Sequence, residues 1–272
     1  MTTTTIDFEA IKKKQRAGWE TGDYPRVGNT LQIIAELLVE AADVRAGQRV
    51  LDVACGQGNA AIAAAFRFAE ATGVDYAANL LAQGRERAAA QNVAVTFTEG
   101  DAEELPFPDA SFDVALSTVG VMFAPNHRQA ADELVRVTAP GGRIGLASWT
   151  PDSMVGAMFK TVGRFAPPPA GVRPPVLWGT PEHLAELFGD RVEWTTFTRR
   201  EYAFRYRSTE HFSEWFRQYY GPITRLAGSL PEPESERFAR ELAEVARQYN
   251  TVDDGTVAAS ATYLEAVGVR RA

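Results

Sequence analysis

The sequence of 272 residues has little of several residue types that mark particular classes of protein, beginning with one cysteine and three histidines. The lone Cys55 cannot form an internal disulfide or a cysteine-only metal site, so the cysteine content does not indicate an oxidising compartment. The chain also lacks an uninterrupted apolar run of the about 18 residues that a membrane span needs. Its start, MTTTTIDFEAIKKKQ, has no apolar stretch typical of a signal peptide. We therefore expect a soluble, cytoplasmic protein without a membrane partner or a bound metal.

Basic residues are in the minority, because 28 Lys and Arg face 35 Asp and Glu, giving a formal net charge of −7. Affinity for nucleic acid depends on clustered basic side chains that neutralise phosphates, so no nucleic-acid partner is expected. The 45% of hydrophobic residues and the length allow one large domain with a sizeable core. A small neutral or apolar substrate fits this composition.

Residues 48–149 alternate short apolar runs with helical stretches, which is the pattern of βαβ units and a parallel sheet. The expected strands lie at residues 49–54, 71–75, 93–99, 112–117 and 143–148. The expected helices between them lie at residues 59–70, 79–91 and 128–137. These connections are too long for hairpins and long enough for crossovers. The sequence therefore predicts a doubly wound α/β fold.

The flanking segments are expected to be mainly helical. Before the first strand we expect disorder at the Thr-rich residues 1–5 and helices at residues 8–18 and 30–42. After Trp149, a proline-dense segment leaves the sheet. The elements expected beyond it are a helix from residue 180, a strand at 192–198 extended to 206, helices at 209–219 and 234–248, and a last strand at the sheet edge, 256–269. We divide the chain into N-terminal helices (1–45), an α/β core (46–150) and helical insertions with the last strands (151–272).

One segment, Val-Leu-Asp-Val-Ala-Cys-Gly-Gln-Gly-Asn, reads as a buried strand that turns sharply into an alanine-rich helix. Gly56 and Gly58 allow the tight turn and let a ligand approach the backbone near the helix N-terminus. The stretch is weak evidence alone, because with Ala61 it also satisfies the Gly-x-Gly-x-x-Gly/Ala fingerprint of dinucleotide-binding enzymes.

Asp52, at the end of that strand, separates two kinds of ligand. A carboxylate there repels the pyrophosphate of a dinucleotide but attracts S-adenosylmethionine, which carries an ammonium and a sulfonium and no phosphate. On geometry alone, capping of the next loop by the Asp52 side chain explains the residue equally well.

Two further acidic residues follow later strands. Asp75 ends the second strand 23 positions after Asp52, close to the offset of about 20 residues at which an acidic residue accepts hydrogen bonds from an adenosine ribose. Asp101 and Ala102 lie beyond the third strand, where the carboxyl group can accept from an adenine amino group and the Ala102 N–H can face a ring nitrogen. Together these positions favour an adenosine ligand.

With these motifs the chain resembles the class I S-adenosylmethionine-dependent methyltransferases, particularly the group of ubiquinone and menaquinone biosynthesis enzymes (methyltransferase type 11). The resemblance covers roughly residues 48–149 and rests on Leu-Asp-Val-Ala-Cys-Gly-x-Gly-Asn, Gly-Val-Asp, Gly-Asp-Ala-Glu-x-Leu-Pro-Phe-Pro-Asp-x-Ser-Phe-Asp-Val and Arg-Val-x-x-Pro-Gly-Gly. It implies a Rossmann-like, mostly parallel seven-stranded sheet with a helical lid insertion. Gln57 departs from the Thr or Ser of most relatives, but only its backbone is needed.

The resemblance also assigns residues to parts of S-adenosylmethionine. Those implied at the methionine end are Asp52, Ala54, Gly56 and Gly58. Asp75 and Tyr76 would face the ribose and adenine, and Asp101 and Ala102 the base. Ser117 to Val119 would lie beneath the cofactor.

Few side chains are candidates for acid–base chemistry. A sulfonium is already an activated methyl donor, so the protein's main tasks are in-line positioning and exclusion of water, and no universal catalytic residue is required. His127 and the hydroxyls of Tyr219 and Tyr220 are weak catalytic candidates. His183 and His211 are expected at the surface.

Aromatic residues crowd the segments outside the sheet. Helical spacing in residues 212–219 is more typical of a packed amphipathic face than of a substrate pocket. In the functional interpretation, part of this set, with Trp19 and Tyr24 beside the cofactor, walls a closed pocket for an apolar acceptor. The aromatic set is Trp149, Phe159, Phe165, Trp178, Trp215, Phe216, Tyr219 and Tyr220. Lys12, Lys13 and Lys14 are expected to form a solvated helix face.

Three functions remain open at this level. The first is methyl transfer to carbon, nitrogen or oxygen of a small molecule by a monomer or homodimer. The second is a nicotinamide-dependent oxidoreductase, which Asp52 and the Gly-Asp-Ala segment disfavour. The third is an S-adenosylmethionine-binding protein without catalysis.

Overall fold

The structure, a computed structural model, describes residues 6–272. The Thr-rich start, for which disorder is expected, lies outside the described residues. A seven-stranded sheet in the order β3-β2-β1-β4-β5-β7-β6 forms the centre of the described chain. Its strands are β1 (Arg49–Val53), β2 (Glu70–Asp75), β3 (Val95–Glu99), β4 (Phe112–Thr118), β5 (Thr138–Trp149), β6 (Val192–Tyr206) and β7 (Val257–Arg270).

The first five strands are parallel, and β7 runs antiparallel to both of its neighbours. In the middle of the sheet, β1 is buried after its first residue because helices cover both faces. Parallel pairing places Asp52 beside Gly73 of β2 and Leu116 of β4. The carboxyl ends of β1, β2 and β4 therefore lie together at one edge, where an open parallel sheet binds its ligands.

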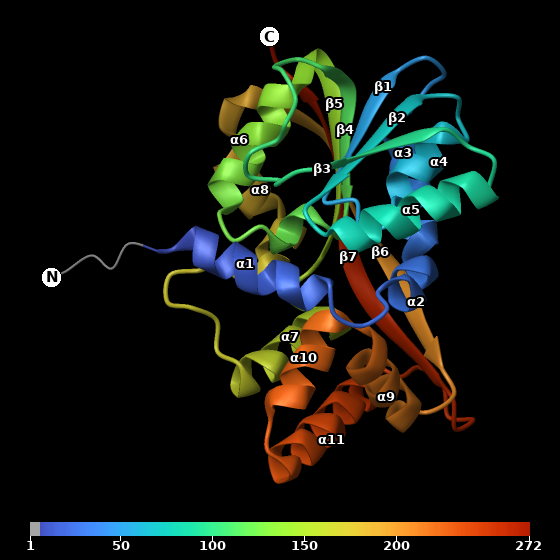
Figure 1. Ribbon diagram of the computed structural model, residues 1–272, viewed down its shortest axis with the longest axis vertical. Coiled ribbons are helices and arrows are strands. Elements are labelled where there is room, and N and C mark those ends of the chain that lie inside the picture. The colour runs from blue at the N-terminus through green and yellow to red at the C-terminus, as the bar shows by residue number, and fades with distance from the viewer. Residues whose placement is uncertain (1–5) are drawn as a thin grey trace, which may run out of the picture.

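Helices pack on the two faces of the sheet as a doubly wound fold requires (Figure 1). On one face lie α3 (Gln32–Ala41), α4 (Asn59–Ala65) and α5 (Ala78–Ala90). On the other lie α6 (His127–Val137) and α8 (Pro181–Phe188). The expected fold class, a Rossmann-like α/β sheet with N-terminal helices and added helices, is confirmed.

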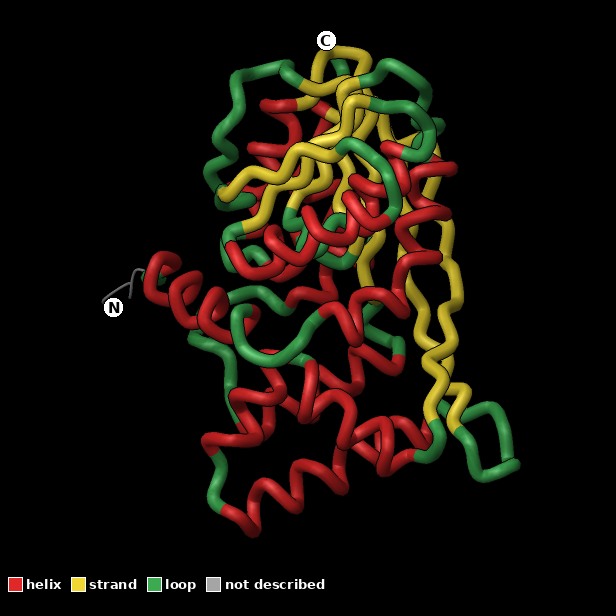
Figure 2. Tube along the Cα trace, turned by 45° about the vertical axis from the view of Figure 1, so that its right-hand side comes forward, coloured by secondary structure: helices red, strands yellow, loops and turns green. Residues whose placement is uncertain are grey.

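A group of helices gathers below the carboxyl edge of the sheet, beside the long extension of β6 and β7 (Figure 2). The group comprises α7 (Met154–Phe165), α9 (Thr209–Tyr219), α10 (Gly221–Ser229) and α11 (Glu232–Gln248). Between this group and the sheet run α1 (Phe8–Trp19) and the short α2 (Pro25–Gly28) (Figure 1). The helix group, α1 and α2 therefore lie beyond the edge of the sheet where ligands bind.

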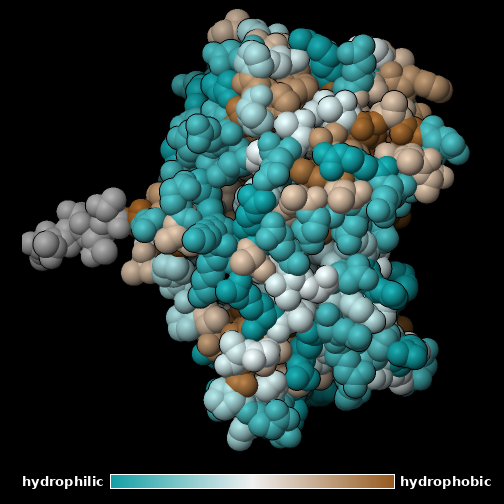
Figure 3. Space-filling model, viewed as in Figure 1, coloured by the Kyte–Doolittle hydropathy of each residue, from teal (hydrophilic) through white to brown (hydrophobic). Residues whose placement is uncertain are grey.

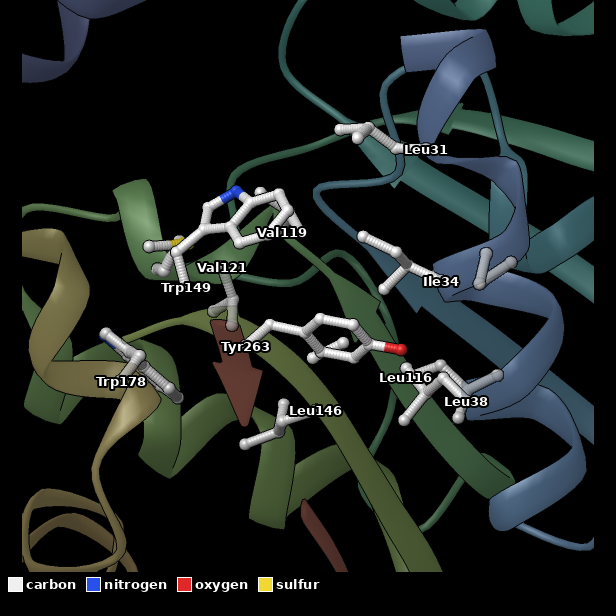
Figure 4. Packing of buried hydrophobic residues seen from close by; sticks show 14 of the residues in the cluster. Leu31, Ile34, Leu38, Leu116, Val119, Val121, Leu146, Trp149, Trp178 and Tyr263 are labelled. Carbon is white, nitrogen blue, oxygen red and sulfur yellow. The ribbon is translucent and has the colours of Figure 1, made fainter. Parts of the chain in front are cut away.

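A continuous core joins the sheet to the added helices. Figure 4 shows Leu38 of α3 beside Leu116 of β4, Leu146 of β5 further from α3, and Trp149 beside Val119. Figure 3 shows that hydrophilic side chains cover most of the face that includes α1. Within residues 6–272 no helix is long and apolar enough to cross a membrane.

Several elements differ from the sequence-based expectation, among them α7 and α10, which are not predicted from the sequence. The last strand, β7, is not at the sheet edge but between β5 and β6, so β6 forms the edge. The helix expected at residues 30–42 begins as a 3₁₀ turn (Asn29–Leu31) and continues as α3, and the short α2 precedes it where no helix is expected. β5 begins at Thr138 instead of residue 143, because the backbone becomes extended immediately after α6 and Thr138 pairs with Phe112. The division at residues 46 and 150 remains a prediction.

Candidate functional site

The backbone at the ends of β1 and β4 takes an unusual conformation. Ala54 (φ 52°) and Gly56 (φ 55°) follow β1, and Val119 (φ 54°) follows β4, all in the left-handed region. A β-branched residue rarely adopts this region, and such strained positions concentrate at functional sites. The chain also approaches itself closely here, since a Cβ on Gly120 would lie 2.2 Å from the Ala54 carbonyl oxygen.

A pocket opens between these two strand ends, at the point where the strand order reverses. It has a volume of about 820 Å³ including its opening to solvent, within the range of ligand pockets. All the expected cofactor residues except Gly58 and Ser117 line it: Trp19, Tyr24, Asp52, Ala54, Gly56, Asp75, Tyr76, Asp101, Ala102 and Val119. The structure thus brings together residues from five segments that are distant in the sequence.

Asp52 is buried and serves two purposes. Its Oδ2 accepts hydrogen bonds from the N–H groups of Ala60 (3.1 Å) and Ala61 (3.0 Å), in the first turn of α4. This is the capping role that sequence left open, and the same carboxyl group also lines the pocket. Burial, together with the charge of Asp75, raises the pKa of Asp52 to about 7.

Asp75 holds the glycine turn against the end of β2. Its Oδ2 accepts from the Gly56 N–H (2.9 Å) and its Oδ1 accepts from the Ala77 N–H (2.8 Å). Burial raises the pKa of this carboxyl group. Because each carboxylate oxygen has a second acceptor position, Asp75 can still accept from hydroxyl groups in the pocket.

Asp101 forms an ion pair at the mouth of the pocket. Lys12 of α1 places its Nζ 2.6 Å from Asp101 Oδ2 and 3.3 Å from Glu103 Oε2, with only 13% of its side chain exposed. Arg16, one turn later, contacts Glu99 at 2.8 Å. The expectation that Lys12 belongs to a solvated helix face is wrong, because three carboxylates, including Glu9 of the same helix, draw its ammonium inward.

The two hydroxyl residues at the end of β4 differ in role. The Ser117 hydroxyl donates to the Val53 carbonyl (2.7 Å) and accepts from the Val121 N–H (2.9 Å), so it joins β1 to the loop beneath the pocket. Thr118, which lies in the segment 117–119 expected beneath the cofactor, lines the pocket, and its buried Oγ1 has no partner among the described residues. A buried hydroxyl without a partner at a pocket wall marks a position where a ligand supplies the missing hydrogen bond.

A second, apolar cavity adjoins the first, with about 360 Å³ of empty space that includes its opening to solvent. Its lining consists of Trp19, Tyr24, Val27, Leu31, Val119, Phe123, Trp149, Val155, Met158, Phe159, Phe204, Phe216 and Tyr220. Part of the expected aromatic set is therefore present, while Phe165, Trp178, Trp215 and Tyr219 lie elsewhere. Phe123 and Phe204 were missed, although Phe123 follows the end of β4, the side on which ligands bind.

The weak catalytic candidates are widely separated. His127 is buried on α6, with its Nδ1 2.9 Å from Nε2 of His183, and it lines neither cavity. The expected surface position of His183 is wrong, because α6 and α8 pack together there and leave it 5% exposed. Tyr219 lies under the Arg26 guanidinium at 5.2 Å, outside both cavities. Tyr220 alone of this group lines the apolar cavity.

The charges of the side chains that line the first pocket indicate which nucleoside ligand fits it. Three carboxyl groups, those of Asp52, Asp75 and Asp101, line the pocket, and Lys12 is the one basic side chain among its described lining residues. That ammonium is already paired with carboxylates. Such a surface repels a pyrophosphate and attracts a ligand with an ammonium and a sulfonium. Within the described chain no cluster of metal-ligating residues is found.

Comparison with known proteins agrees with this chemistry. A methyltransferase domain family matches residues 50–142. An uncharacterised protein of Mycobacterium tuberculosis is 36% identical over 252 residues, 91% of this chain and 92% of its own. A demethylmenaquinone methyltransferase of Thermus thermophilus is 39% identical over 115 residues, 42% of this chain and 52% of its own. The structure of a putative methyltransferase from Bacillus halodurans superposes with a TM-score of 0.64 at 18% identity, covering 88% of this chain and 99% of that one.

The acidic pocket lies at the reversal of the strand order, inside the residues that the methyltransferase domain family matches. The chain belongs to the class I S-adenosylmethionine-dependent methyltransferases, and S-adenosylmethionine is its cofactor.

Proposed function

We propose that this enzyme methylates a small apolar or aromatic metabolite, at carbon, nitrogen or oxygen, inside a closed pocket. The observation that carries the proposal is the apolar cavity, which shares a wall with the cofactor pocket. All of its lining residues are hydrophobic, and their only polar groups are tyrosine hydroxyls and tryptophan N–H groups. An acceptor with a formal charge would be desolvated there without a partner, at a cost of several kcal/mol.

The residues of the first pocket, together with Gly58 and Ser117, which do not line it, are proposed to hold the cofactor. Asp52, Ala54, Gly56 and Gly58 would lie at its methionine end, and Asp75 and Tyr76 at its ribose and adenine. Asp101 and Ala102 would face the base, with Ser117 and Val119 beneath. S-adenosylmethionine supplies a methyl group that is already activated by the sulfonium, so the chain needs to orient the acceptor and keep water out.

The hydroxyls nearest the acceptor are proposed to orient it and not to remove a proton. Burial, with the charges of Asp75 and Asp52, raises the pKa of Tyr24 to about 12, and burial raises that of Tyr220 well above its usual value. Both phenols are therefore neutral near pH 7 and act as hydrogen-bond donors or acceptors. A general base with a pKa near 7 is the kind that works best at neutral pH, and neither phenol has one.

The relatives do not identify the methyl acceptor of this chain. The demethylmenaquinone methyltransferase of Thermus thermophilus matches only 42% of this chain, so its acceptor does not transfer to the helices that line the apolar cavity. The nicotinamide-dependent alternative gains no support from the comparisons. We also propose a cytoplasmic location, which the single cysteine supports.

The test is methyl transfer from radiolabelled S-adenosylmethionine to a panel of small metabolites graded in polarity. We expect label in apolar and aromatic acceptors and none in charged ones. Val155→Phe narrows the cavity from α7, where Val155 is 2% exposed. This variant should lose most of the transfer while its affinity for S-adenosylhomocysteine stays within about twofold, at a stability cost of about 1–3 kcal/mol for overpacking.

Lys160→Ala, an exposed change on the same helix, is the matched control and should leave transfer unchanged. Label found mainly in charged acceptors, or full transfer by Val155→Phe, would contradict the apolar acceptor site.

A further inference from the structure

The long strand β6 has one free edge. It pairs with β7 on one side and forms the edge of the sheet on the other. Most of its residues from Thr195 to Glu201 are exposed, and the large apolar side chain of Phe197 is 41% exposed. A long exposed edge presents a row of unpaired backbone groups, which can pair with a strand of another chain.

The hydrogen bonds of β7 show which residues of β6 direct their backbone groups to that edge. The Thr262 carbonyl accepts from the N–H of Thr150, which follows β5, so the backbone of Thr262 faces away from β6. Glu201 lies opposite Thr262 in the antiparallel register and therefore faces away from β7. Because this direction alternates along a strand, the residues with outward N–H and C=O groups are Phe197, Arg199, Glu201, Ala203 and Arg205.

Two of these outward-facing residues carry opposite charges. The Arg199 side chain is 55% exposed and contacts Asp152 at 2.8 Å. The Glu201 carboxylate accepts from the hydroxyls of Thr262 (2.6 Å) and Ser260, which orient it without neutralising its charge. Since both residues have the same parity along the strand, their side chains lie on one face of β6.

The order of these charges suits pairing of β6 with the same strand of a second copy. A twofold axis at Arg200 sets Arg199 opposite Glu201 of the second copy and Phe197 opposite Ala203, and symmetry repeats each pair. All of these residues face outward, so each pair exchanges both backbone hydrogen bonds. A shift of two residues in either direction instead opposes Arg199 or Glu201 to its own copy, which is unfavourable.

A groove beside the free edge gives a second strand room. It has a volume of about 570 Å³ including its opening to solvent, and its lining consists of Thr30, Tyr202, Ala203, Phe204, Arg205, Tyr206, His211 and Trp215. The same register places Thr198 of the second copy opposite Tyr202 and Thr196 opposite Phe204. The small side chains of the second strand therefore meet the aromatic side of the groove.

We propose that β6 is a dimerisation edge, at which two copies of the chain join their sheets through Arg199–Glu201 pairs. Arg200 lies at the axis and is already neutralised by Glu265, whose Oε2 accepts from its Nε at 2.8 Å. One strand pair buries less surface than the about 1,200–2,000 Å² of a stable interface, so the dimer dissociates in the micromolar range. This inference does not depend on the proposed methyl acceptor.

Sedimentation equilibrium of the full chain from about 5 to about 500 μM tests the inference. Wild-type protein should show a reversible equilibrium between monomer and dimer. Glu201→Arg and Arg199→Glu should each raise the dissociation constant about tenfold or more, because each sets like charges against one another. The double variant Arg199→Glu/Glu201→Arg restores opposite charges and should return the constant to within about threefold of the wild-type value.

A backbone variant tests the edge without changing charge. Ala203→Pro removes an outward N–H but no hydrogen bond of the β6–β7 ladder, so it should abolish the dimer and leave the fold intact. Glu236→Arg, an exposed charge reversal on α11, is the matched control and should not change the constant. The substituted residues line neither the first pocket nor the apolar cavity, so unchanged binding of S-adenosylhomocysteine shows that each variant is folded.

Three results would overturn the inference. They are a wild-type protein that stays monomeric at every concentration, a dimer that Glu201→Arg and Ala203→Pro leave intact, and single charge reversals that the double variant does not rescue. None of these results bears on the cofactor site, because binding of S-adenosylhomocysteine is measured separately.

Discussion

Lys12 and Asp101 lie 89 positions apart, yet Lys12 Nζ donates to Asp101 Oδ2 at 2.6 Å across the mouth of the pocket between the ends of β1 and β4. The contact joins α1 to the end of β3, and Gln15 extends it by donating to the Phe123 carbonyl at 3.1 Å. These polar contacts help to hold α1 over the pocket, together with the packing of Trp19 at the end of the helix.

We expect Lys12→Ala to loosen α1. A partly buried ion pair of this kind contributes about 1 kcal/mol, so opening of the helix should become about fivefold more frequent. Hydrogen exchange of the amides at residues 8–19 measures this directly. Lys13→Ala, an exposed change on the same helix, should leave exchange unchanged. Equal exchange in the two variants would show that Lys12 does not hold α1 closed.

Asp75→Ala should weaken binding of S-adenosylhomocysteine by about 1–3 kcal/mol, as expected for a lost charge-assisted hydrogen bond. The substitution also leaves the N–H groups of Gly56 and Ala77 without their acceptor. Asp75→Asn, which retains one carbonyl oxygen, should therefore lose less. Calorimetry measures both, with exposed Asp190→Ala as the control. Unchanged affinity in Asp75→Ala would remove this residue from the site.

The affinity for S-adenosylhomocysteine should rise with pH near neutrality. The pKa of Asp52 is raised to about 7, so the carboxyl group gains its charge through this range and then attracts the ligand's ammonium. Titrations from about pH 6 to about pH 8 should show a gain of at most about tenfold per pH unit. Asp52→Asn keeps a capping oxygen but should bind weakly at every pH. A wild-type affinity independent of pH would exclude this role.

The same group has the opposite effect on the free protein. Between the ordinary pKa of 3.8 and about 7, folded Asp52 retains a proton that the unfolded chain has lost. Its contribution to the free energy of unfolding therefore falls as pH rises through this window. Urea unfolding of wild-type protein and Asp52→Asn at several pH values measures how much of the pH dependence of the free energy of unfolding is due to Asp52. Parallel curves for the two proteins would show that Asp52 titrates normally.

The buried His127–His183 pair predicts sensitivity to acid. Burial is the main cause that lowers the pKa of His127 to about 3, so the folded protein keeps the ring neutral while the unfolded chain takes up a proton below pH 6.5. Stability should fall as pH drops from about 6.5 towards 3. His127→Gln should reduce this slope, whereas His211→Gln, on the partly exposed part of α9, should change it less. Urea midpoints at each pH provide the measurement.

Much of the sheet and of the cofactor pocket is predictable from sequence because the signals are local. The glycine turn, Asp52 and Asp75 lie at strand ends that alternating apolar runs already reveal, and parallel pairing brings such ends together. The doubly wound order of elements similarly fixes which helices cover which face. For these parts, spacing along the chain is enough.

The remaining features depend on contacts between distant segments. Nothing around Lys12 distinguishes it from Lys13 and Lys14, and only the docking of α1 against residues 99–103 draws it inward. The burial of His183 depends on how α8 meets α6. The insertion of β7 between β5 and β6 has no local signal either, because an alternating strand pairs equally well at an edge or inside a sheet.

The measurement that tests the central claim most directly is a pair of calorimetric titrations of the wild-type protein, one with S-adenosylhomocysteine and one with NAD. The acidic pocket between the ends of β1 and β4 predicts saturable binding of S-adenosylhomocysteine and no detectable binding of NAD. Tight binding of NAD without a response to S-adenosylhomocysteine would contradict the account.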